Sequence, residues 1–74
     1  MTVKRMVAYH ISRLKDKNSA VRLKSINELA LLGDPDALEA LQEVYQNDTD
    51  SEVRKAAQEA GRAIFLKQKQ QQRS

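Results

Sequence analysis

The 74-residue sequence contains no cysteine, one proline and two glycines. Without cysteine the chain has no disulfide framework, no thiolate metal ligand and no cysteine nucleophile. Valine and isoleucine are sparse, which argues against a β-rich fold. No apolar run approaches the roughly 20 residues that a membrane span needs. The basic residues near the start are not followed by the apolar stretch of a secretory signal, so we expect a cytoplasmic protein.

The sequence also lacks a set of side chains that would support catalysis. His10 is the single histidine, and no group of His, Asp and Glu residues has the spacing of a metal site. The run Asp48-x-Asp50-x-Glu52 resembles part of a calcium loop, but it lacks the glycine of the sharp turn and the later bidentate glutamate. No glycine-rich phosphate loop is present. We therefore expect a protein that is not an enzyme and that binds no cofactor, metal or small-molecule substrate.

One short stretch of the sequence occurs twice. Residues 16–22 read Asp-Lys-Asn-Ser-Ala-Val-Arg, and residues 48–54 read Asp-Thr-Asp-Ser-Glu-Val-Arg. The Asp, Ser, Val and Arg positions are identical at an offset of 32 residues (48 − 16). A fixed period of about 20–50 residues is typical of stacked repeats. The sequence therefore predicts two repeats, the first over about residues 2–33 and the second over about residues 34–66.

Helical periodicity and capping residues divide the first repeat into two helices. Apolar positions with helical spacing indicate a first helix over residues 3–15. Asn18 or Ser19 can cap the start of a second helix, because either side-chain oxygen can accept a hydrogen bond from a first-turn N–H. Gly33 can end that helix in the left-handed conformation that glycine adopts readily.

The second repeat has the same kind of signals. Asp34 is a good N-cap for a third helix, and Pro35 at the next position lacks only an N–H that would be unpaired there. A fourth helix can begin after Asp50 as N-cap, or with Thr49 and Glu52 as a capping box. The sequence thus predicts four helices in all.

The last third of the sequence carries two further signals. Gly61 lies inside the fourth helix, where glycine costs about 1 kcal/mol relative to alanine, so we expect a close contact with a neighbouring helix there. Residues 67–74 are basic and rich in glutamine, with no apolar face. We expect this tail to be disordered and the folded domain to span residues 1–66.

Two runs of the sequence resemble the HEAT-repeat family. They are residues 32–37 (Leu-Gly-Asp-Pro-Asp-Ala) and residues 48–57 (Asp-Thr-Asp-Ser-Glu-Val-Arg-Lys-Ala-Ala). The similarity covers residues 7–66 and is greatest to the short HEAT-like repeats named after phycobilisome (phycocyanobilin) lyases. It implies an all-α fold of two HEAT-like helix pairs, which form a short α-solenoid. Lyases of that kind have far longer arrays, so the resemblance implies a shared fold and not their activity.

The resemblance also implies roles for the repeated Asp and Arg residues. In HEAT-like repeats the loop aspartate accepts hydrogen bonds from an arginine of its own or an adjacent repeat, which forms a ladder. Guanidinium–carboxylate pairs suit such a role because their hydrogen bonds are charge-assisted and can be bidentate. The expected ladder residues are Asp16, Arg22, Asp48 and Arg54. The alternative is that Arg22 and Arg54 bind phosphate.

Charge is distributed unevenly along the chain. Residues 1–24 hold seven basic side chains and one acidic one, whereas residues 25–61 hold two basic and nine acidic ones. Residues 62–74 add four basic side chains, for a net charge of +3 (13 − 10). A basic first helix and tail can bind nucleic-acid phosphates, which is one functional hypothesis. The acidic middle and the lack of a recognition motif argue against it.

We favour protein binding over nucleic-acid binding. About three repeats are normally needed for independent stability, and this chain has two, so apolar side chains at its ends should remain exposed for protein contacts. We expect an accessory or regulatory subunit of a larger complex, for which the resemblance suggests a phycobilisome or photosynthesis-related one, or a homodimer. The expected contact residues include the outward positions of the second and fourth helices, which line the concave face in HEAT-like arrays. They are Met6, Tyr9, Lys24, Asn27, Glu28, Leu31, Lys55, Gln58, Glu59, Arg62 and Phe65.

Overall fold

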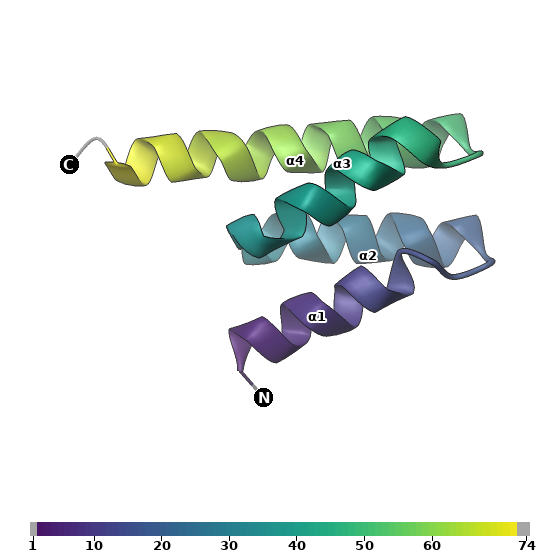
Figure 1. Cartoon of the computed structure of the whole chain (residues 1–74), viewed down its shortest axis with the longest axis horizontal. Helices are drawn as coiled ribbons and strands as arrows, with labels where there is room; N and C mark the ends of the chain where they lie inside the picture. The colour runs from purple at the N-terminus through teal and green to yellow at the C-terminus, as the bar shows by residue number, and fades with distance from the viewer. Residues whose placement is uncertain (1, 73–74) are drawn as a thin grey trace.

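The computed structural model describes residues 2–72, which form four α-helices and one short 3₁₀ turn (Figure 1). In chain order these are α1 (Val3–Arg13), α2 (Ser19–Leu32), the 3₁₀ turn η1 (Pro35–Ala37), α3 (Leu38–Asn47) and α4 (Ser51–Gln72). This part of the chain contains no strand. The predicted all-α fold of two helix pairs is confirmed.

Side chains in the loops start two of the helices as the sequence predicts. The Asn18 side-chain oxygen accepts a hydrogen bond from the Ala20 N–H at 2.9 Å, and Asp50 accepts one from the Glu52 N–H at 2.8 Å. Each bond satisfies a first-turn N–H that has no partner within its helix. Gly33 ends α2 with a φ of 66°, in the left-handed region.

The third helix starts in two stages. Asp34 accepts a hydrogen bond from the Asp36 N–H at 2.9 Å, and Pro35 occupies the first helical position, as predicted. The turn that follows is a 3₁₀ turn, and the α-helix proper begins at Leu38. Tighter 3₁₀ turns are common at helix starts.

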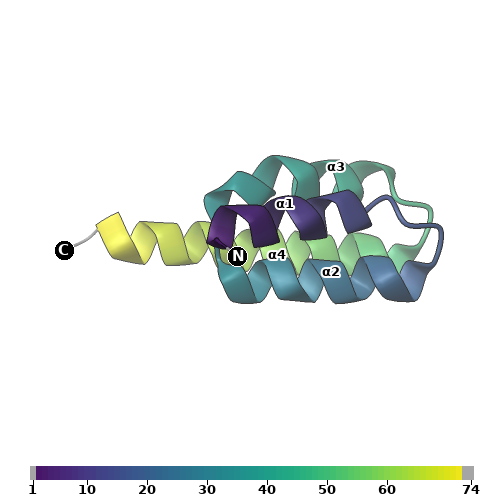
Figure 2. The same ribbon diagram turned by 90° about the horizontal axis from the view of Figure 1, so that it is seen from below.

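The helices form two layers. Figures 1 and 2 show α1 and α3 in one layer and α2 and α4 in the other, so that each helix pair spans both layers. The loop between α1 and α2 and the loop between α3 and α4 lie at the same end of the molecule (Figure 1). The second pair therefore repeats the placement of the first, which brings the two copies of the Asp-to-Arg stretch side by side.

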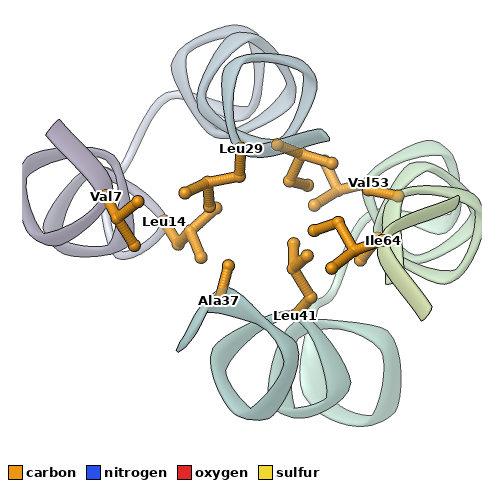
Figure 3. Close-up of a cluster of buried hydrophobic side chains, with 10 residues drawn as sticks. Val7, Leu14, Leu29, Ala37, Leu41, Val53 and Ile64 are labelled. Atoms are coloured by element: carbon orange, nitrogen blue, oxygen red, sulfur yellow. The ribbon is translucent and has the colours of Figure 1, made fainter. Parts of the chain in front are cut away.

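The hydrophobic core lies between the two layers and receives side chains from all four helices (Figure 3). Ile26 and Leu29 from α2 and Val53 from α4 have no exposed surface. Burying a side chain of this size contributes about 1.5–3 kcal/mol relative to leaving it exposed. The buried apolar residues are Val7, Leu14, Ile26, Leu29, Ala37, Leu41, Val53, Ala57, Ala60 and Ile64.

The prediction of a close contact at Gly61 is wrong. A Cβ atom built on Gly61 would meet no neighbouring atom within 4 Å. The close approach is at Gly33, where a Cβ atom would lie 2.8 Å from Nζ of Lys67. Helical spacing alone places a residue on a helix, but it does not say whether another helix covers that position.

The prediction of a disordered tail is corrected for residues 67–72. These residues continue α4, which ends at Gln72, and residues 73–74 lie outside the described part of the chain. Lysine and glutamine, which make up residues 67–72, are good helix formers, and extending a helix that already exists avoids the cost of nucleating one. A segment without an apolar face can therefore stay helical when a packed helix precedes it.

None of the helices in residues 2–72 is long and apolar enough to cross a membrane.

Candidate functional site

The loops at one end of the molecule are joined by an ion pair between the repeats. Arg22, in the first turns of α2, donates from Nε to Asp48 Oδ2 at 2.9 Å and from Nη2 to Oδ1 at 3.1 Å. Both side chains are largely buried, with exposed fractions of 13% for Arg22 and 8% for Asp48. Such a bidentate, charge-assisted pair sets the relative position of the groups that it joins as well as stabilising them.

Arg22 also binds the loop of its own repeat. Its Nη1 atom donates to the carbonyl oxygens of Asp16, at 2.8 Å, and Lys17, at 3.1 Å. A single guanidinium group thus bridges the loop before α2 and the loop before α4. The carboxylate of Asp16 makes a different contact, accepting a hydrogen bond from the Asn18 N–H at 2.9 Å.

Arg54 occupies the equivalent place in the second repeat but binds differently from the prediction. Its Nη1 atom donates to the Asp48 carbonyl oxygen at 2.7 Å, which matches the bond from Arg22 to the Asp16 carbonyl. Among residues 2–72, Arg54 forms no ion pair with a carboxylate. The expected pairing of Arg54 with a loop carboxylate is therefore not present among residues 2–72. The carboxylate equivalent to the one that Arg22 binds would lie one repeat period after Asp48.

A second ion cluster joins the repeats at the opposite end of the helices. Lys4 Nζ lies 2.9 Å from Asp34 Oδ2 and 2.8 Å from Asp36 Oδ2. Hydrogen bonds to Asp36 and Asp34 raise the pKa of Lys4 above its ordinary value of 10.5. The hydrogen bond from Lys4, followed by that from the Asp36 N–H, lowers the pKa of Asp34 below its ordinary value of 3.8.

This ion cluster was not predicted from the sequence. The sequence does contain a signal for the contact between Lys4 and Asp34. The two residues are 30 positions apart, close to the repeat period, and each lies at the start of the first helix of a pair. Opposite charges at equivalent positions of stacked repeats fall next to each other.

Two grooves lie on the outer sides of the helix pairs. The first, which we call the α3–α4 groove, has a volume of about 510 Å³. Gly61 forms part of its floor, and Tyr45 and Phe65 are exposed along it, with exposed fractions of 38% and 53%. Gln58 Nε2 donates across it to the Tyr45 hydroxyl oxygen at 3.4 Å. The lining residues are Leu38, Glu39, Leu41, Gln42, Tyr45, Ala57, Gln58, Gly61, Arg62 and Phe65.

The second groove, the α1–α2 groove, lies on the first helix pair and has a volume of about 330 Å³. Tyr9 is 54% exposed there, with the Arg13 guanidinium 5.8 Å from the centre of its ring and the His10 ring packed edge-on, 5.1 Å away. The lining residues are Tyr9, His10, Arg13, Val21, Lys24, Ser25 and Glu28. This groove carries more positive charge than the α3–α4 groove.

The structure distributes the predicted contact residues over three places. Tyr9, Lys24 and Glu28 line the α1–α2 groove, whereas Gln58, Arg62 and Phe65 line the α3–α4 groove. Four others lie outside both grooves and are exposed: Asn27, Leu31, Lys55 and Glu59. Met6 is half-buried in α1. The residues thus do not form one continuous surface. Gln42 and Tyr45 also line the α3–α4 groove and were not predicted as contact residues. Tyr45 follows Leu38 and Leu41 at helical spacing, so the sequence alone does not distinguish it from a core residue.

Residues 2–72 contain no group of three or more His, Cys, Asp and Glu side chains placed to hold a metal ion.

The pattern of the family described as "HEAT repeats" matches residues 3–61 of the chain. Searches of curated proteins and of solved structures found no match. The matched range covers both helix pairs and most of the sequence. Together with the two-layer stacking and the pairing between the loops, it shows that the chain belongs to the HEAT repeat family.

Proposed function

We propose that this chain is a non-catalytic protein-binding module and that the α3–α4 groove is its contact site. HEAT repeats generally mediate contacts between proteins, and their stacking leaves end faces that another element can cover. The single observation that carries the proposal is the exposure of Tyr45 and Phe65 beside Gly61 in this groove. Aromatic side chains on a rigid surface are the anchors that protein interfaces favour.

The shape and chemistry of the groove suit a helix from the partner. Leu38, Leu41 and Ala57 give the groove an apolar lining between α3 and α4, against which the side chains of a third helix can pack. Glu39 on α3 and Arg62 on α4 add one charge of each sign to the rim. A partner with an amphipathic helix and mixed charges beside its apolar face fits this arrangement.

Co-purification from the native source tests the proposal. The double variant Tyr45→Ala, Phe65→Ala removes both exposed aromatics, and Leu31→Ala is the matched control because Leu31 is 78% exposed but lies outside both grooves. We expect the double variant to lose the partner, the control to keep it, and both to keep their helical circular dichroism spectra. Equal recovery of the partner by all three proteins would refute the assignment of the groove.

The finer proposals about the partner come from the resemblance. The similarity of residues 32–37 and 48–57 to lyase-type repeats supports a light-harvesting complex as the partner and an accessory or regulatory role for this chain. Mass spectrometry of the co-purified proteins tests this, and a partner unrelated to photosynthesis would overturn it.

The nucleic-acid alternative has one structural observation in its favour. Of the seven basic side chains in residues 1–24, only Lys4 and Arg22 pair with a carboxylate in the described part of the chain. The remaining five are available for phosphates. They are Arg5, Arg13, Lys15, Lys17 and Lys24. We rank this function second because α3 and the loops beside it are acidic.

A further inference from the structure

The loop ladder has one complete rung and two unfilled positions. Arg22 and Asp48 form the rung, while Arg54 and Asp16 are their equivalents one repeat later and one repeat earlier in the chain. Both arginines donate from Nη1 to the carbonyl of the aspartate six residues before them, at 2.8 and 2.7 Å. Both aspartates accept a hydrogen bond from the N–H two residues later, at 2.9 Å.

The unfilled positions are complementary to each other. Nε and Nη2 of Arg54, the two atoms with which Arg22 binds its aspartate, have no carboxylate partner among residues 2–72. In the same part of the chain, the Asp16 carboxylate receives no arginine. Arg54 is already held in place by its bond to the Asp48 carbonyl, and Asp16 by its bond to the Asn18 N–H. Both groups are thus oriented before any partner arrives.

We propose that a second copy of this chain stacks head to tail on the first, with Asp16 of one copy accepting the two free hydrogen bonds of Arg54 of the other. The stack repeats between copies the geometry that Arg22 and Asp48 have within the chain. It rests on the proposed function, because the α3–α4 groove is again the surface that is covered. The α1–α2 groove of the next copy covers it.

The two grooves are compatible in character. The α1–α2 groove presents Tyr9 with Arg13, Lys24 and Glu28. The α3–α4 groove presents Phe65 with Glu39 and Arg62, so each groove holds charges that the other can pair. Their segments also have opposite charge excesses, basic in residues 1–24 and acidic in residues 25–61. Apolar area and opposite charges therefore meet in one contact.

No helix within residues 2–72 blocks this contact. The part of α4 beyond the body of the molecule runs along the helix axis, and not across the face on which the next copy would lie (Figures 1 and 2). A head-to-tail contact uses two different surfaces and does not close after two copies. The proposal therefore predicts a series of oligomers rather than a single dimer.

Sedimentation velocity over a wide range of concentrations, with two variants, tests the stack. Asp16→Asn keeps an acceptor for the Asn18 N–H but removes the charge, and Arg54→Gln removes the guanidinium. We expect the unmodified chain to form dimers and larger species as concentration rises. The association constant of each variant alone should be at least about ten-fold lower than that of the unmodified chain. This is the loss expected when a charge-assisted hydrogen bond is removed.

An equal mixture of the two variants gives the sharpest result. The Asp16→Asn variant keeps Arg54, and the Arg54→Gln variant keeps Asp16. One molecule of each can therefore form a single complete Arg54–Asp16 pair, and the outer ends of that dimer cannot form another. We expect the mixture to recover dimers at the affinity of the unmodified chain, without larger species. Unfolding midpoints of the separate variants within a few degrees of the parent would show that both are folded.

Three results would overturn the stack: a monomer at every concentration, single variants that associate like the parent, or a mixture that associates no better than either variant. The proposed function is judged separately by the Tyr45→Ala, Phe65→Ala co-purification. If that variant loses a different protein while the parent is monomeric, the groove binds protein and only the self-stacking is refuted.

Discussion

Arg22 donates two hydrogen bonds to the carboxylate of Asp48, 26 residues away in the sequence, and holds the two loops of this HEAT repeat protein together. The same guanidinium binds the backbone of its own loop through the Asp16 carbonyl. The register between the two helix pairs thus depends on one largely buried side chain as well as on the apolar core.

Replacement of Arg22 by alanine should therefore destabilise the fold strongly. We expect a loss of about 3 kcal/mol in the free energy of unfolding, because the variant leaves the Asp48 carboxylate buried without its partner. Arg22→Lys should recover only part of this loss, since lysine cannot form the planar bidentate pair. Urea denaturation measures both values. Arg54→Ala is the comparison, with an expected loss of about 1 kcal/mol because only the bond to the Asp48 carbonyl disappears.

The two glycines should respond in opposite directions to alanine. Gly61→Ala should stabilise the protein by about 1 kcal/mol, the helix propensity difference, because nothing lies within 4 Å of the added Cβ. Gly33→Ala should destabilise it by at least about 1 kcal/mol, because Gly33 has a positive φ and the Lys67 side chain lies over it. Thermal and urea denaturation measure both effects. A destabilising Gly61→Ala would show that the groove floor is covered in solution.

The ion cluster around Lys4 makes stability depend on pH in a defined direction. The folded pKa of Asp34 is lowered, so its contribution is present above the unfolded value of about 3.8 and is lost as pH falls through the folded pKa. The folded pKa of Lys4 is raised, so its contribution is complete below the unfolded value of about 10.5 and is lost as pH rises through the folded pKa.

The Lys4→Met variant measures this contribution. We expect it to be less stable than the parent at pH 7 and to approach the parent's stability as the pH falls through the lowered folded pKa of Asp34. Urea denaturation at a series of pH values gives the comparison. A stability difference that does not change between pH 7 and pH 2 would show that the effect of Lys4 is not electrostatic.

Nucleic-acid binding should be weak at physiological ionic strength if protein binding is the function. We expect fluorescence anisotropy with mixed DNA and RNA oligomers to show no tight binding under these conditions. Binding through the basic surface would fall linearly with the logarithm of salt concentration and would weaken when Arg5, Arg13 or Lys15 is neutralised. Tight, salt-sensitive binding with that dependence would reverse the order of the two functional proposals.

The helices were predictable from sequence because their signals are local. Caps such as Asn18 and Asp50 act on an N–H two residues away, and Gly33 ends its helix through its own φ. These interactions are complete within one or two turns and need no other part of the chain. The 32-residue repeat adds that the second pair copies the first, which is enough to indicate stacked helix pairs.

The helical conformation of residues 67–72 depends on the helix that precedes them as well as on their own composition. Residues 67–72 lack an apolar face, but they follow a helix that the core already holds, and they contain no residue that ends it. Helix extension depends on what precedes a segment as well as on its own composition.

By itself, the sequence determined the four helices, their order and the repeat, because each of these depends on contacts within a few residues or on the period between two copies. Only the tertiary structure decided that Arg22 binds Asp48 while Arg54 takes a carbonyl, that Lys4 meets Asp34, and that Gly61 lies open in a groove. These features depend on which neighbour each helix face meets. Among residues 2–72, each helix pair meets the other pair on one side only.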